Sequence, residues 1–93
     1  MQKLEMELTE KETLTLEYRV FEYQGLQINL NQFLNNNYEF NEEHYNRLIE
    51  TLIDKYTLLQ HCLFNILESH GYKNISVKSY DFYLTESTLT VIT

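Results

Sequence analysis

Histidine and cysteine side chains are the first candidates for chemistry, because near neutral pH they act as bases, nucleophiles and metal ligands. The chain has one cysteine, Cys62, and three histidines, His44, His61 and His70. His61 and Cys62 are adjacent, which on a helix places them about 100° apart and prevents them from sharing one proton or metal ion. No two histidines have the four-residue spacing of a helical zinc site. We expect these residues to be structural, with no metal site and no cofactor.

Carboxylates and glycines, the other residue types that could support catalysis or phosphate binding, show no informative spacing. The 14 acidic residues are numerous enough that pairs arise by chance. Gly25 and Gly71 are the only glycines, and they lie too far apart to form a phosphate-binding loop. Cys62 has no Gly-rich segment beside it that could stabilise an oxyanion. The sequence therefore predicts a protein that is not an enzyme.

The acidic residues are concentrated in the first part of the chain. Residues 1–54 carry the entire net charge of −7, whereas residues 55–93 are neutral overall. Such a surface repels nucleic-acid phosphates and attracts basic protein surfaces, so we expect a basic protein partner and no direct nucleic-acid binding. Aromatic residues accompany the acids in one segment. We expect a partner-binding patch there, formed by Tyr38, Glu39, Phe40, Glu42, Glu43, Tyr45, Glu50 and Asp54. The alternative, that the acids only keep a small chain soluble, stays open.

The element expected to position this patch is a long amphipathic helix over about residues 41–70. Asn41 is a suitable N-cap, and acidic residues follow it where the helix dipole favours negative charge. Apolar residues then recur in alternating steps of four and three from Tyr45 onwards. Gly71 is placed to end the helix in a left-handed conformation.

Strand-like patterns flank this helix on both sides. Residues 3–9 and 13–20 alternate between apolar and polar side chains, which predicts a hairpin within a strand region over residues 3–30. Residues 74–93 predict a C-terminal hairpin. The expected fold is a single α+β domain over residues 1–93, in which a small antiparallel sheet (ββ(β)αββ order) packs against one long amphipathic helix.

The predicted helix is longer than the sheet that would cover it. A helix of about 29 residues spans about 44 Å, whereas strands of about seven residues span about 23 Å. Two arrangements remain open: a monomer whose helix breaks near Tyr56, or a homodimer in which a second copy covers the surplus. For the homodimer we expect an interface formed by Tyr56, Leu59, Leu63 and Ile66.

Composition indicates the setting of the protein. Ala, Pro and Trp are absent while Asn, Tyr and Ile are frequent, a bias toward AT-rich codons that suggests a low-GC bacterium, its phage or its plasmid. Acidic residues near the start interrupt the apolar region that a secretory signal would need, and no apolar run is long enough for a membrane span. With a single cysteine, the chain is expected to be cytoplasmic, without an export signal or a membrane interaction.

Two functions fit these expectations. The first is a small acidic non-enzymatic protein-binding module, phage- or plasmid-encoded, that inhibits a host or defence protein by covering its basic nucleic-acid-binding surface. Anti-CRISPR-like and DNA-mimic-like inhibitors have this general character, although no motif of the chain matches a family. The second is a homodimeric structural or accessory protein that uses the long helix as an assembly element.

Overall fold

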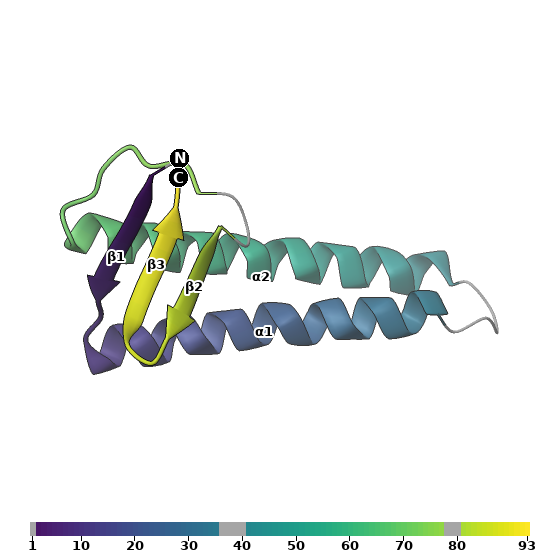
Figure 1. Ribbon diagram of the computed structural model, residues 1–93. Coiled ribbons are helices and arrows are strands. Elements are labelled where there is room, and N and C mark those ends of the chain that lie inside the picture. Colours follow the sequence, from purple (N-terminus) through teal and green to yellow (C-terminus); the bar gives the residue numbers. More distant parts are fainter. Residues whose placement is uncertain (1, 36–40, 78–80) are drawn as a thin grey trace.

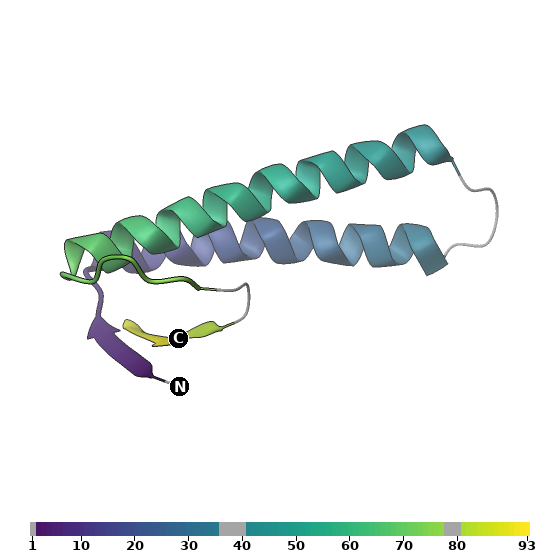
Figure 2. The same ribbon diagram turned by 90° about the horizontal axis from the view of Figure 1, so that it is seen from above.

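The protein is a long helical hairpin with a small sheet lying across one of its ends (Figures 1 and 2). The computed structural model describes residues 2–35, 41–77 and 81–93. Its elements in chain order are β1 (Lys3–Glu7), α1 (Glu10–Asn35), α2 (Glu42–Ser69), β2 (Phe82–Thr85) and β3 (Thr88–Ile92). The hairpin determines the elongated shape, which measures 49 × 25 × 19 Å along the principal axes. The expected mixture of helices and an antiparallel sheet is confirmed.

The first helix, α1, is the main departure from the predicted fold. Residues 10–35 form one continuous helix, so the strand region expected over residues 3–30 is correct only for β1. The error has a physical cause: α1 has apolar residues on two opposite faces, and over residues 14–20 such a helix alternates like a strand. Leu16 is fully buried, whereas Leu14 and Tyr18 are exposed. The element order is therefore βααββ, and the prediction of only one long helix is wrong.

The second helix, α2, forms where the sequence predicts it and has the expected caps. The side-chain oxygen of Asn41 accepts a hydrogen bond from the backbone N–H of His44 at 3.1 Å. Beyond the C-terminal end, Gly71 has φ of +90°, the left-handed conformation that glycine adopts without strain. The helix continues through Tyr56, so the break considered there as one of two alternatives does not occur. The length that the strands cannot cover is instead covered by α1 of the same chain (Figure 1).

The sheet is antiparallel, with strand order β1-β3-β2. The central strand β3 joins the two ends of the chain, because it pairs with β1 on one side and with β2 on the other. The predicted C-terminal hairpin is confirmed for β2 and β3, and Glu86 has the positive φ (56°) that such a tight turn requires. Ile75 and Val77, expected in a strand, lie in an irregular segment. Residues 78–80 of the predicted hairpin lie outside the described residues.

The hydrophobic core lies between the sheet and the adjoining end of the hairpin. Its fully buried side chains come from both helices and from β3: Leu16, Leu63, Leu67, Leu89 and Val91. Among the described residues from 17 to 58, none is buried. Residues 25–35 and 42–55 extend beyond the sheet (Figure 2), and we call them the uncovered half of the hairpin.

Candidate functional site

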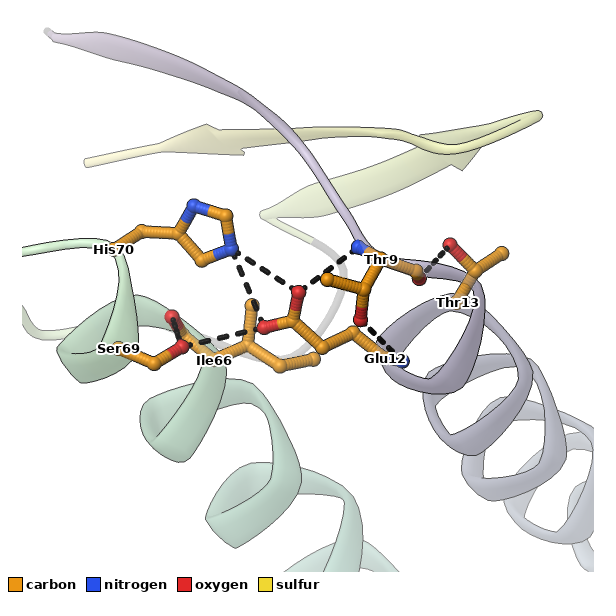
Figure 3. A network of polar contacts seen from close by, with 6 residues as sticks. All are labelled: Thr9, Glu12, Thr13, Ile66, Ser69 and His70. Atoms are coloured by element: carbon orange, nitrogen blue, oxygen red, sulfur yellow. Dashed lines mark hydrogen bonds and ion pairs between the residues drawn. The ribbon is translucent and has the colours of Figure 1, made fainter.

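A polar network joins the start of α1 to the end of α2 (Figure 3). The backbone N–H of Thr9 donates to Glu12 Oε1 at 2.9 Å, and the backbone N–H of Glu12 donates to Thr9 Oγ1 at 3.1 Å. This reciprocal pair is a capping box, which satisfies two N–H groups at a helix start. The Glu12 carboxylate also contacts Ser69 Oγ at 3.2 Å and His70 Nε2 at 3.2 Å. The hydrogen bond from the Thr9 backbone, with a smaller contribution from His70, holds the pKa of Glu12 below its ordinary value.

The geometry of this network suits a structural link between two helix ends better than catalysis. A serine nucleophile needs a base in hydrogen-bond contact, with a third group orienting that base. Here Ser69 and His70 both bind Glu12, and Ser69 Oγ also donates to the carbonyl of Ile66 at 2.9 Å. Within the described residues, no hydrogen bond joins Ser69 to His70. The shared carboxylate therefore ties two helix ends together.

Cys62, His61 and His44 lie outside this network or at its edge. Cys62 lines a groove of about 400 Å³ between the helices, together with His61 and Arg19. Burial raises the pKa of the Cys62 thiol, which disfavours the thiolate that a nucleophile or metal ligand requires. His44 makes an edge-on contact with the ring of Phe33, with ring centroids 4.9 Å apart. Cys62 and His44 are thus held by packing between α1 and α2, whereas His61 is exposed at the rim of the groove.

Residues 2–35, 41–77 and 81–93 contain neither a candidate metal site nor a helix that could span a membrane. No group of three or more His, Cys, Asp or Glu side chains there is arranged to hold a metal ion. None of the helices in that part of the chain is both long and apolar enough to cross a membrane.

The acidic patch predicted from the sequence is only partly assembled. Glu42, Glu43, Glu50 and Asp54 are exposed along α2. Tyr45 is half-buried and its ring stacks near that of Phe33, with centroids 6.4 Å apart, so it lies on the α1 side of the helix. Tyr38, Glu39 and Phe40 lie outside the described residues. The structure therefore groups Glu43, Glu50 and Asp54 on one side of α2 and places Tyr45 on the side that faces α1.

The exposed carboxylates form a row on the outer side of α2. Glu43, Glu50, Asp54 and Glu68, which we call the acidic row, share one side of the helix because their spacings are close to whole turns. Leu59 is buried, and the nine residues between it and Glu50 correspond to half a rotation, so the acidic row faces away from the core. Within the described residues, one ion pair involves this row, between Glu43 and Arg47 at 2.6 Å.

The residues predicted to form a dimer interface lie inside the chain. Leu59, Leu63 and Ile66 are 3%, 0% and 5% exposed and belong to the core. Tyr56 is half-buried against Tyr23 of α1, with ring centroids 5.5 Å apart. Their side chains already contact α1 and the sheet, because α1 supplies the covering element that a second copy was expected to supply. The surface open to a second copy must therefore lie elsewhere.

Sequence reasoning missed an exposed apolar surface on α1. We call its members, which recur in steps of 4-3-4-3-4, the α1 stripe: Leu14, Tyr18, Phe21, Gly25, Ile28 and Gln32. Its four large apolar side chains are 58%, 57%, 75% and 56% exposed. The heptad spacing is present in the sequence. The alternation of apolar and polar side chains over residues 14–20 is a stronger signal, and it predicts a strand. Beside Phe21, a groove of about 380 Å³ separates α1 from β2 and is lined by Phe82, Tyr83 and Leu84.

Comparison with known proteins does not place the chain in a family. No protein-family model, no curated protein and no solved structure matches it. The candidate site consists of two exposed surfaces of the hairpin, the acidic row on α2 and the α1 stripe, and both extend from the covered end into the uncovered half.

Proposed function

We propose that this chain is a small acidic protein-binding module that is not an enzyme. The observation that supports this most strongly is the uncovered half of the hairpin. A soluble two-helix unit normally buries an apolar seam against a further layer, because two helices alone cannot enclose a core. Here that layer is the sheet, and it stops before residues 25–35 and 42–55. A partner bound to this half would supply the missing layer.

The charge of the α2 side favours a basic partner. The acidic row runs along the outer side of α2, and Glu42 adds a further exposed carboxylate at its start. Only Arg47 offsets these charges by an ion pair within the described residues. A basic protein surface gains long-range attraction from such an arrangement, which speeds association and orients the encounter.

The concrete form that we propose is an inhibitor that occupies the nucleic-acid-binding surface of a host or defence protein. A surface that binds phosphates presents lysine and arginine side chains, and these can pair with carboxylates held at intervals along a rigid helix. The net charge of −7 makes direct binding of the chain to nucleic acid unfavourable. Competition with DNA for a basic protein is the expected activity.

A displacement assay tests this proposal. The probe is a DNA-binding protein without sequence specificity, bound to fluorescently labelled duplex DNA, and the protein is added at increasing concentration. We expect the protein to displace the DNA. Displacement should weaken steeply as salt is added, because the electrostatic screening length shortens from about 10 Å at 0.1 M ionic strength to about 3 Å at 1 M. The Glu50→Gln/Asp54→Asn double variant should weaken displacement at least about tenfold, since two desolvated charges are lost.

The matched control removes the same charge from another surface. Glu5 on β1 and Glu86 in the β2–β3 turn are exposed carboxylates outside the acidic row and the α1 stripe, so Glu5→Gln/Glu86→Gln should retain displacement. An equal loss in both double variants would show that net charge alone matters and would contradict a defined binding face. A salt-insensitive interaction would contradict the charge-based form of the proposal.

A further inference from the structure

The α1 stripe is an apolar surface that no element of the described part of the chain covers. α1 forms one long margin of the molecule, with α2 on its inner side (Figure 1). Leu14, Tyr18, Phe21 and Ile28 are each more than half exposed, and Phe21 is 75% exposed. Single exposed apolar residues are ordinary, but four in heptad register on one helix face are the pattern of a helix–helix seam.

We propose that the α1 stripe binds a second copy of the chain, with the two α1 helices antiparallel about a twofold axis near Gly25. A twofold interface uses the same patch on both copies, so the patch must be complementary to itself. This interface lies on α1 and is independent of the acidic row on α2, and it therefore goes beyond the function proposed above.

Charge is the first argument for a second copy as the occupant. Each copy carries a net charge of −7, so self-association requires a surface where like charges do not meet. Residues 23–35 contain no charged side chain, and this segment makes up about half of α1. A basic partner would gain nothing from this neutral segment, whereas a second copy can approach it without repulsion.

The flanking residues determine the antiparallel direction. Glu17, Gln24 and Asn31 follow one another at seven-residue intervals along one border of the α1 stripe. In an antiparallel pair centred on Gly25, Glu17 lies level with residue 33 of the second copy, about 3 Å along the axis from the amide of Asn31. In a parallel heptad pair, Glu17 would instead lie beside Glu22 of the second copy. The Glu22 carboxylate is already paired with Arg19 and Lys55 of its own chain at 3.3 and 3.5 Å and offers Glu17 no hydrogen-bond donor. The antiparallel pair places each Glu17 near an amide.

Packing at the centre of the pair supports the same arrangement. Phe21 of one copy would contact Ile28 of the second copy. The second copy's Gly25 lies beside this contact, and because glycine has no side chain it leaves room for the Phe21 ring. A Cβ added at Gly25 meets no atom of its own chain within 4 Å, so packing within the chain does not explain a glycine inside this helix. The four large side chains expose on the order of 400 Å². This is about half of the roughly 800 Å² per partner of a standard interface, and the exposed amides of Gln24, Asn31 and Gln32 add to it.

Sedimentation velocity over a wide concentration range tests the interface. We expect the mass to rise from the 11.3 kDa of one chain to twice that value. The Phe21→Gln and Ile28→Gln variants should each weaken association by at least about 100-fold, because each lost apolar contact occurs twice in the dimer. Both side chains are exposed in one chain, so the variants should keep the far-ultraviolet circular dichroism of the wild type.

Ile53 provides the matched control, since it is 57% exposed but lies on α2. Ile53→Gln should leave the association unchanged. A mass of 11.3 kDa throughout the concentration range would overturn the proposal. Loss of the dimer in Ile53→Gln but not in Ile28→Gln would also overturn it.

Chemical cross-linking tests the direction of the pair. In a Cys62→Ser background, Gly25→Cys should be joined to itself by a short bismaleimide, because residue 25 lies at the twofold axis. Leu14→Cys should not be joined, since two such cysteines would lie about 33 Å apart along antiparallel helices. Ile53→Cys should also remain unlinked. Efficient linkage at both 14 and 25 would indicate parallel helices and would refute the proposed arrangement.

Discussion

Glu12 stabilises two helix ends at once. Its carboxylate accepts the capping-box hydrogen bond from Thr9 at the start of α1 and contacts Ser69 and His70 at the end of α2. The start of one helix favours an acid, and the end of the other favours a cation such as protonated histidine. A single ionised side chain therefore links the two helix ends at the end of the hairpin that carries the sheet (Figure 3).

This arrangement predicts a pH-dependent stability that Glu12→Gln should remove. The pKa of Glu12 is lowered in the folded chain, chiefly by the Thr9 backbone hydrogen bond. The unfolded chain therefore binds the proton more tightly, and the stabilisation is present above the ordinary value of 4.5 and is lost as pH falls through the folded pKa. Above that range, Glu12→Gln should lower the free energy of unfolding by about 1–2 kcal/mol.

The measurement is urea denaturation of both proteins at a series of pH values. The difference between them should shrink as the pH falls below 4.5, because the protonated carboxyl of the wild type then resembles the amide. Glu5→Gln, which changes an exposed carboxylate on β1, serves as the control and should show little difference at any pH. A Glu12→Gln difference that stays constant down to strongly acidic pH would contradict the assigned role of the ionised group.

The two helices differ in how readily their sequences reveal them. α2 could be predicted because it has one apolar face and recognisable caps, Asn41 at its start and Gly71 beyond its end. α1 is harder to recognise, because over residues 14–20 its inner face and the α1 stripe together produce a strand-like alternation that outweighs the heptad spacing. The Thr9–Glu12 capping box was nevertheless present in the sequence and is a helix-start signal.

The strand arrangement was less accessible to sequence reasoning. β1 pairs with β3 from the opposite end of the chain, and no local pattern specifies such a pairing. The groove between Phe21 and β2 depends on this strand order, so the sequence could not reveal it. The exposed acids of α2 were predictable, whereas the separation of Tyr45 from them follows from helix geometry once α1 is known to pack there.

The packing of α2 beneath the sheet gives an element-level prediction. Leu63 is fully buried, so Leu63→Ala should lower the free energy of unfolding by about 2–5 kcal/mol through lost contacts and a cavity. Ile53→Ala, an exposed position on the same helix, should change it by no more than about 0.5 kcal/mol in the monomer. Chemical denaturation at low protein concentration measures both values. Near-equal effects would contradict the assignment of Leu63 to the core.

At the scale of the whole molecule, stability is unevenly distributed along the hairpin. The sheet and the buried residues occupy one end, and the uncovered half has exposed or half-buried side chains only. The two long surfaces of the hairpin also differ in charge, because the acidic row lies on α2 and the neutral segment lies on α1. The proposed basic partner and the proposed second copy would therefore bind separate faces of the hairpin.

Hydrogen exchange followed by mass spectrometry, over a concentration range from micromolar to near millimolar, most directly tests whether another molecule completes the uncovered half. At low concentration, amides of residues 25–35 and 42–55 should exchange faster than those of residues 59–67, because few buried contacts protect them. At high concentration, exchange in α1 should slow in the wild type but not in Phe21→Gln/Ile28→Gln. Exchange that is equally slow along both helices at every concentration would contradict the account.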